Sequence, residues 1–413
     1  MGKIARRRRL VPTINGLEDR RLLSGYTPAR VQAAYGFSGV SFATADGGTV
    51  KGDGAGQTIA IIASYHNPNL LSDLQVFDQA NGLPTADVTV VNLAGDATDP
   101  TWASESAMDV QWAHALAPAA AIVLVEAKSD SGVDVMAAVD AARSIPAVTV
   151  VSMSFGFTET PGQRAFDPRF TTPPGHVGIT FVAASGDHGP AGGAMYPASS
   201  PNVLGVGGTT VQLGAAGGVA SESLWSQSAR GPSRYAPRPA FQSAFQRGPR
   251  RTTPDVVFLG DPNTGVEVFH TPPGSTEGSW RTFAGTSLGS PAWAAIVAIA
   301  DQGRALAGKG SLDGPSQTLP ALYALAGTTA FRRIAGAVPA AAAGLGAPNV
   351  EALVPGLVEF TTASAARPSG PGARRSPPTP SRRPAPRSTP APRPLPGRSL
   401  RPSWGPARVD RGF

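Results

Sequence analysis

The sequence of 413 residues contains no cysteine. Neither a disulfide framework nor a thiolate metal site is therefore available to it. It also contains no run of eighteen apolar residues of the kind that forms a transmembrane helix, so we expect no membrane span. Apolar residues nevertheless make up 41% of the chain, which is enough for a sizeable buried core. The length allows two average domains or one large α/β domain with appendages.

The middle of the chain lacks the basic excess that the net charge of +7 suggests. Residues 1–25 contribute +5 and residues 363–413 contribute +10, so residues 26–362 carry a net charge of −8. A domain that grips nucleic acid has the opposite arrangement, with the basic residues in its folded part. We therefore expect no specific nucleic-acid partner.

The two basic ends differ in composition from the middle. Residues 1–25 form a basic arm with a leader-like segment but no apolar stretch of signal-peptide length. Residues 363–413 hold thirteen Pro and eleven Arg, and such a segment cannot offset its ordering entropy by burial. We predict a disordered tail there, one folded domain over 26–362, and bacterial-type export to the cell surface or the extracellular space.

From residue 57 onward, short apolar runs alternate with segments of helical periodicity. Strands that are apolar throughout, with helices between them, are typical of a parallel sheet covered on both faces. We predict an α/β fold with a doubly wound, mostly parallel sheet whose active groups lie at the carboxyl ends of strands. The predicted strands are 58–63, 88–93, 121–125, 148–153 and 179–184, and the predicted helices are 70–79, 102–117, 133–143 and 290–306.

The predicted helix 290–306 follows a candidate nucleophile. Residues 205–285 are rich in Gly, Ser and Pro and favour loops and hairpins. Next comes Gly-Thr-Ser-Leu-Gly-Ser-Pro at 285–291, which places Ser287 just ahead of the helix and Pro291 in its first turn. A hydroxyl there points into a cleft, and the helix dipole favours negative charge beside it. Gly-Thr-Ser alone would fit a helix cap, but the Ser-Pro and the long apolar helix after it favour a nucleophile.

A serine nucleophile needs a base within hydrogen-bond reach, and that base is ordinarily a histidine held by an aspartate. Five histidines occur, and none stands in the His-Gly-Thr-His setting that a subtilisin places on its catalytic helix. His114, in Trp-Ala-His-Ala-Leu, fits a helix surface or the edge of the core better than it fits a base. The usual triad is therefore not evident.

The corresponding helix carries a pair of carboxylates instead, Glu105 and Asp109. Their spacing of four residues puts both on one helical face, one turn apart. The flanking residues are apolar or small, so a solvated acidic face is a poor explanation for the pair. Buried carboxylates this close are costly unless they share a proton, and such a pair forms a coupled acid/base unit. We interpret the pair as functional.

A third acid follows the apolar run 181–184 in Ser-Gly-Asp-His-Gly. Subtilisins have an oxyanion-binding Asn at the matching strand end, whereas this chain has Asp187. A carboxylate would repel an oxyanion, so Asp187 can donate a hydrogen bond only when it is protonated. A turn-forming Asp is a strong alternative for this motif taken alone.

Taken together, these segments resemble the sedolisins, the serine-carboxyl peptidases with a subtilisin-like fold. The resemblance covers most of residues 26–358 and is carried by many matches in the same order. Beyond the motifs above, the matching stretches are 26–37, 115–118, 150–156, 196–201, 206–209, 254–256, 262–265 and 344–348.

The resemblance implies a serine-type endopeptidase that acts on proteins or peptides as a monomer. Ser287 would attack the peptide carbonyl and Glu105 would take its proton, with Asp109 tuning Glu105 and Asp187 stabilising the oxyanion. Ser154, Phe155 and Gly156 lie where the fold usually pairs its backbone with an extended substrate. An exposed Glu has a pKa of about 4.3 and Asp187 must be protonated, so we predict an acidic optimum.

The sequence departs from the family in its last segment. The family's calcium loop has Asp ligands, whereas this chain has Arg333 at the first position and only alanine at 340–343. Calcium prefers carboxylate and other oxygen ligands. We predict no family-type calcium site and no other cofactor. A second departure is Ser-Ala-Arg-Gly-Pro-Ser at 228–233, where Ala229 and Arg230 replace family glycines and could re-aim a loop near the site.

Three other functions stay open at this point. The first is a catalytically inert sedolisin-like module that binds surfaces. The second is a true subtilisin-type protease with a displaced histidine. The third is a nucleic-acid or polyanion binder that acts through the basic tail.

Overall fold

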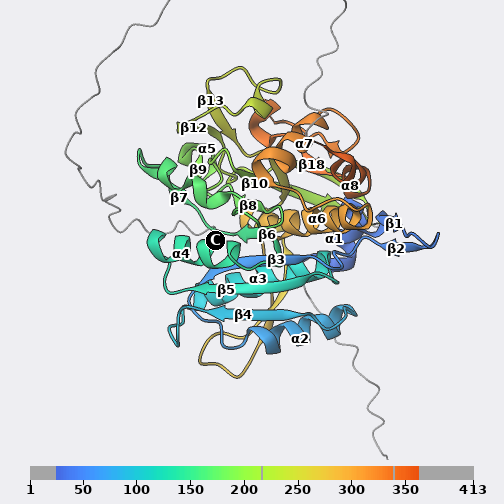
Figure 1. Ribbon diagram of the computed structural model, residues 1–413. Helices are drawn as coiled ribbons and strands as arrows, with labels where there is room; N and C mark the ends of the chain where they lie inside the picture. Colours follow the sequence, from blue (N-terminus) through green and yellow to red (C-terminus); the bar gives the residue numbers. More distant parts are fainter. Residues whose placement is uncertain (1–24, 215–216, 338–339, 362–413) are drawn as a thin grey trace, which may run out of the picture.

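The computed structural model describes residues 25–214, 217–337 and 340–361 (Figure 1). The predicted arm, apart from Gly25, and the predicted tail 363–413 lie outside the described residues. Within these ranges, no helix combines the length and the hydropathy needed to span a bilayer.

A central sheet of eight strands organises the described region. Its order is β11-β10-β8-β6-β3-β5-β4, with β14 also pairing with β10, and every pairing is parallel except that of β11. The predicted doubly wound, mostly parallel α/β fold is confirmed. The strands are β3 (Thr58–Ser64), β4 (Val88–Asn92), β5 (Ala121–Ala127), β6 (Val148–Met153), β8 (Thr180–Ala184), β10 (Val203–Leu213), β11 (Val219–Leu224) and β14 (Val256–Leu259).

The middle strands are apolar because both of their faces are covered. All residues of β3, β6 and β8 are buried. In the register of the sheet, Ile59 of β3 lies between Ile122 of β5 and Val150 of β6, so branched side chains form a continuous layer. Burial of such side chains is the main stabilising term, at roughly 25 cal/mol per Å² of apolar surface removed from water.

Helices cover the sheet on both sides (Figure 1). α3 and α4 both pack on β3 and β5 but not on each other, which places them on opposite faces. α6 packs beside α3 and crosses β6, β8 and β10. The helices are α1 (Pro28–Tyr35), α2 (Leu70–Asn81), α3 (Pro100–Leu116), α4 (Gly132–Arg143), α5 (Gly189–Gly192), α6 (Thr286–Leu306), α7 (Leu319–Ala324) and α8 (Val350–Glu359).

The prediction of loops and hairpins for 205–285 is wrong in part. β10 and β14 lie in the central sheet as parallel strands, although both fall largely within that segment. The glycines of β10 obscured it: a Cβ at Gly207 would lie 2.7 Å from Pro254, and one at Gly208 would lie 2.8 Å from Trp225. Glycine here permits close packing and does not mark a turn.

The hairpins predicted for the same segment are present. β12 pairs with β13 and β15 pairs with β16, both antiparallel. Three further two-stranded pairs lie outside the central sheet, namely β1 with β2, β7 with β9, and β17 with β18. These strands are β1 (Ser41–Ala43), β2 (Thr49–Lys51), β7 (Phe157–Thr158), β9 (Met195–Tyr196), β12 (Gly231–Pro237), β13 (Arg250–Thr253), β15 (Val266–His270), β16 (Ser279–Phe283), β17 (Phe331–Arg332) and β18 (Ala347–Pro348).

α6 begins four residues earlier than predicted, at Thr286, so Ser287 lies in its first turn and Pro291 in its second. A proline at this point cannot donate to the carbonyl four residues before it, which is that of Ser287. The Ser154 hydroxyl hydrogen-bonds that carbonyl instead, at 3.1 Å. The side chain of Ser154, the residue after β6, thus replaces a helical hydrogen bond, which is consistent with a helix that starts ahead of its proline.

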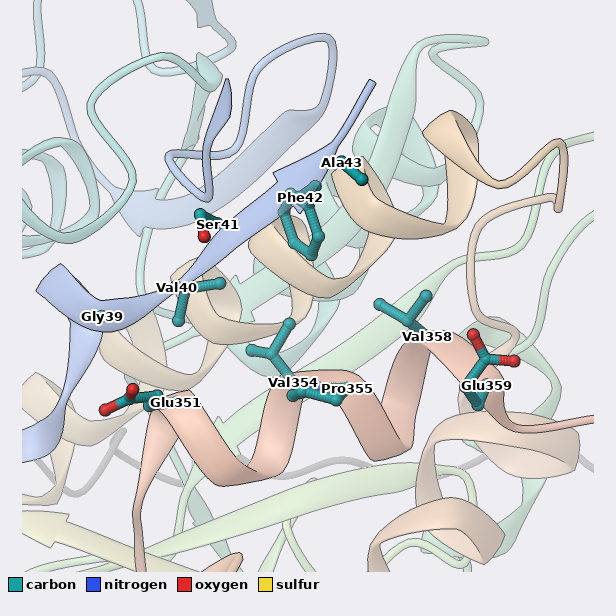
Figure 2. Close-up of a pocket in the computed structure, with 10 residues that line it drawn as sticks. All are labelled: Gly39, Val40, Ser41, Phe42, Ala43, Glu351, Val354, Pro355, Val358 and Glu359. Carbon is teal, nitrogen blue, oxygen red and sulfur yellow. The ribbon is translucent and has the colours of Figure 1, made fainter. Parts of the chain in front are cut away.

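A groove of about 310 Å³ lies between β1 and α8 (Figure 2). Val354 and Val358 point from α8 toward Val40 and Phe42. The ring of Phe42, which lines this groove, packs against Gly303 of α6, sixteen residues after Ser287. At 1.5 Å per residue this is about 24 Å along the helix. The groove is therefore separate from the region around Ser287.

Candidate active site

The candidate residues come from elements that meet at one edge of the sheet. Ser154 directly follows β6, and Asp187 lies three residues after β8, which is parallel to β6. The carboxyl ends of parallel strands lie at the same edge, where α/β folds carry their ligands. α6 also begins at this edge, because Thr286 hydrogen-bonds Asp187 and Gly186.

Ser287 is the second residue of α6 and is 4% exposed. The residue before the helix, Gly285, has φ of +103°, a conformation that glycine adopts without strain. This turn brings the chain sharply from β16 into the helix. The amide groups of the first helical turn lie beside the serine, and their partial positive charge favours an anion near it.

The Ser287 hydroxyl lies close enough to the carboxyl group of Glu105 to lower the pKa of that group. Burial acts more strongly in the opposite direction, and the neighbouring Asp109 and Asp187 add to it, so the pKa of Glu105 is well above its usual range. The side chain comes from α3, whose residues from Trp102 to Leu116 are all buried. The solvated acidic face considered for α3 is therefore not present.

Asp109 is fully buried one turn further along α3. Its Oδ1 accepts a hydrogen bond of 2.9 Å from Ser154, while Oδ2 is buried and without a hydrogen-bond partner among the described residues. Burial raises the pKa of Asp109 well above its usual range, and the Ser154 bond opposes this. The Glu105–Asp109 pair therefore retains a proton at pH values where exposed carboxyls are ionised.

Asp187 caps the start of α6. Its Oδ1 accepts from the Thr286 amide at 2.9 Å and from the Thr286 hydroxyl at 2.6 Å. Its Oδ2 is buried and has no hydrogen-bond partner among the described residues. Burial raises the pKa of Asp187, and the two Thr286 bonds oppose the rise. The carboxyl is near enough to Glu105 to raise the pKa of that residue as well.

The histidines are engaged away from the candidate nucleophile. His66 bonds Glu126 at 2.7 Å, and His114 bonds the Pro84 carbonyl at 2.9 Å. His176 bonds backbone carbonyls, and His270 lies 3.8 Å from Asp73. His188, beside Asp187, is exposed. The acid whose pKa the Ser287 hydroxyl affects is Glu105, and its role as the base, which the resemblance implies, stays a prediction.

The predicted substrate-binding stretch, Ser154, Phe155 and Gly156, begins directly after β6. Its side chains face inward: Ser154 bonds Asp109, and Phe155 packs against Phe157 with ring centroids 5.9 Å apart. Pairing of a peptide with this backbone stays a prediction. The divergent loop lies against the site, because the Ala229 amide donates to the Gly186 carbonyl at 2.7 Å.

The last segment does not have the donor set of a calcium site. Residues 331–348 contain no Asp or Glu. The guanidinium group of Arg332 lies there, 3.1 Å from Glu222 and over the ring of Tyr35 at 4.8 Å. The absence of a family-type calcium site stays a prediction. Among the described residues, no group of three or more acidic or histidine side chains is arranged to hold a metal ion.

Two contributors to the site were missed from the sequence, the side chains of Thr286 and Ser154. Thr286 was considered only as a neighbour of the nucleophile, and Ser154 only for its backbone. A signal for Ser154 was present, because Pro291 leaves the Ser287 carbonyl without its helical donor. Thr286 had no comparable signal, since its role depends on the distant Asp187.

Comparison with known proteins identifies the family of the chain. The model of the Subtilase family matches residues 93–312, which is more than half of the chain. Sedolisin from Pseudomonas sp. (strain 101) is 28% identical over 280 residues, a match that covers 59% of this chain and 46% of the relative. The chain thus matches about half the length of that curated relative.

A solved structure of Pseudomonas sedolisin, a serine-carboxyl proteinase complexed with two molecules of pseudo-iodotyrostatin, has the same fold. The TM-score is 0.67 at 24% sequence identity, and the likeness covers 80% of this chain and 97% of that one. The chain therefore belongs to the subtilase family, and within that family it is similar to sedolisin.

Proposed function

We propose that the protein is a serine peptidase that hydrolyses peptide bonds at acidic pH through Ser287, Glu105, Asp109 and Asp187. The observation that carries the proposal is that the Ser287 hydroxyl lies close enough to the buried carboxyl group of Glu105 to lower its pKa. It gives the candidate nucleophile a base without a histidine, in a buried site where electrostatic interactions are strong. Membership of the subtilase family supports the choice of serine peptidase as the class.

In the proposed reaction, Glu105 takes the hydroxyl proton as the Ser287 oxygen bonds to the peptide carbonyl carbon. The carbonyl oxygen becomes negative and receives a hydrogen bond from protonated Asp187. Glu105 then gives its proton to the leaving amine as the C–N bond breaks, which leaves an acyl-enzyme. Water repeats the sequence and releases the acid.

The pH dependence follows from which groups must hold a proton. Glu105 must be ionised while its partner Asp109 stays protonated, so a second proton on the pair stops the reaction at low pH. Asp187 must be neutral, so its ionisation stops the reaction at high pH. Burial raises the pKa of Asp187, which keeps it neutral at pH values where an exposed Asp, with a pKa of about 3.9, is ionised.

The proposal also covers the metal requirement, the location and the oligomeric state. We propose that no family-type calcium ion is needed, because residues 331–348 offer no carboxylate and contain Arg332. Extracellular or cell-surface location and a monomeric state stay predictions.

The test is hydrolysis of a fluorogenic peptide between pH 2.5 and 8 by the wild type and by Ser287→Ala. We expect a bell-shaped profile with an acidic maximum, and loss of at least about 10³-fold in kcat in the variant. Activity that survives Glu105→Ala at neutral pH would support a subtilisin-type protease with a displaced histidine. A folded wild type without Ser287-dependent hydrolysis at any pH would support the inert surface-binding module.

A further inference from the structure

The hydroxyl of Thr286 connects Gly186 and Asp187 to the first turn of α6. Its Oγ1 accepts a hydrogen bond from the Gly186 amide at 3.0 Å and lies 2.6 Å from Asp187 Oδ1. The Thr286 amide also donates to Oδ1, at 2.9 Å. The residue is 1% exposed, so water does not supply alternative partners to the hydroxyl. These contacts join the loop after β8 to the first turn of α6.

The direction of these bonds determines where a proton on Asp187 can reside. The Gly186 amide uses the hydroxyl as an acceptor, so the hydroxyl hydrogen must point elsewhere. The acceptor that it reaches in the described part of the chain is Oδ1. Oδ1 already accepts two hydrogen bonds from Thr286, so a proton on Oδ1 would weaken both, which is unfavourable in a buried place. Oδ2 has no hydrogen-bond partner among the described residues and is the oxygen left to carry the proton.

We infer that Thr286 is a positioning residue that holds Asp187 with its proton on Oδ2, directed to the oxyanion. The inference rests on the proposed function and extends it, because it assigns separate tasks to the two oxygens of one carboxyl group. Oδ1 caps α6, and Oδ2 donates to the substrate. A rotated carboxyl would present an acceptor to the oxyanion and repel it.

The groups around Asp187 determine in which direction its pKa moves when the Thr286 hydroxyl is removed. Glu105 faces it from α3, and His188 follows it in the chain. The two bonds from Thr286 and the charge of His188 lower the pKa of Asp187, against the larger rise from burial. Loss of the Thr286 hydroxyl therefore raises the pKa further. A variant without it should be slower yet remain protonated to higher pH.

The experiment compares Thr286→Val, Thr286→Ser and Thr286→Cys by kcat against pH. Thr286→Val keeps the shape and removes the hydroxyl, so we expect kcat to fall at least about 10-fold and the alkaline limb to move to higher pH. Thr286→Ser should restore most of the rate and the wild-type limb. Thr286→Cys, with a weaker donor, should lie between them and provides the test if the valine variant fails to fold.

Thr318→Val is the matched control, because it removes a fully buried hydroxyl that bonds Thr180, outside the site. It should lower thermal stability and leave the pH profile unchanged. Wild-type kcat and an unmoved alkaline limb in folded Thr286→Val would overturn the inference while Ser287-dependent hydrolysis keeps the proposed function intact. Absence of Ser287-dependent hydrolysis in the wild type would overturn both.

Discussion

At the scale of single residues, the proposed site depends on carboxyl groups whose pKa values are raised by burial. Asp187 can be tested by replacement with an amide, because Asn offers Oδ1 to Thr286 and an N–H to the oxyanion without titrating. We expect Asp187→Asn to lower kcat at the optimum about 10-fold or more and to remove the alkaline limb.

The measurement is kcat against pH for Asp187→Asn beside Asp46→Asn, an exposed aspartate in the turn between β1 and β2. The control should keep the wild-type profile. An alkaline limb that persists unchanged in Asp187→Asn would assign that limb to another group.

Ser154 is the second residue with a testable contribution. Its hydroxyl bonds Asp109 Oδ1 and the Ser287 carbonyl, and Ser154→Ala leaves both buried acceptors without it. We expect the free energy of unfolding to fall by about 1–3 kcal/mol. We also expect kcat to fall, because the Glu105–Asp109 pair and Ser287 lose a contact that they share. Chemical denaturation and single-turnover kinetics measure the two effects.

Ser144→Ala, which removes an exposed hydroxyl at the end of α4, is the control. Unchanged kcat in Ser154→Ala with reduced stability would limit Ser154 to a structural role.

The sequence predicts residues of the candidate site where the spacing of nearby residues determines their geometry. Glu105 and Asp109 could be paired because four residues on a helix is a fixed geometry, and Ser287 could be placed because its helix is long and apolar. Thr286 could not, because its partner Asp187 lies 99 positions away. Contacts between distant segments depend on the sheet order, which local periodicity does not specify.

At the scale of elements, the limits of prediction have a similar cause. The five predicted strands have strong apolar runs and were found close to their predicted bounds. β10 was missed because the glycines at 205, 207 and 208 remove the apolar pattern, and they are needed where Pro254 and Trp225 approach. The start of α6 was misplaced because the donor that compensates for Pro291 is Ser154, a distant residue just after β6.

Ser290 supports α6 at this same point. Its hydroxyl lies 2.9 Å from Ser152 and accepts from the Met153 amide at 3.1 Å, so it fixes the first turns of α6 on β6. Ser290→Ala leaves a buried amide unpaired, and we expect a loss of about 1–3 kcal/mol in unfolding free energy by urea denaturation. Ser72→Ala, an exposed helical serine, should change it by less than about 0.5 kcal/mol. Equal losses in the two variants would contradict this role for Ser290.

At the scale of the whole molecule, the raised pKa values of several buried carboxyl groups all make the folded state less stable as the pH rises. Burial raises the pKa values of Glu105, Asp109, Asp187 and Asp301. A group whose pKa is higher in the folded state binds protons more tightly there than in the unfolded chain. Its contribution is fully present below the unfolded pKa, near 4, and is lost as the pH rises through the folded pKa. We therefore expect the folded state to be more stable at acidic pH, where the proposed activity is also expected to be highest.

Asp301 allows the effect of a raised pKa on stability to be measured apart from catalysis, because it lies in α6 fourteen residues after Ser287. Its Oδ1 accepts from the Leu312 amide at 2.8 Å, and its buried Oδ2 has no hydrogen-bond partner among the described residues. Asp301→Asn keeps an acceptor for Leu312 and cannot ionise, so its melting temperature should fall less than that of the wild type between pH 4 and pH 8. Asp46→Asn should not flatten the curve, because the pKa of Asp46 is lowered and its contribution has the opposite sign. Parallel curves for the wild type and Asp301→Asn would show that Asp301 is not held neutral by the fold.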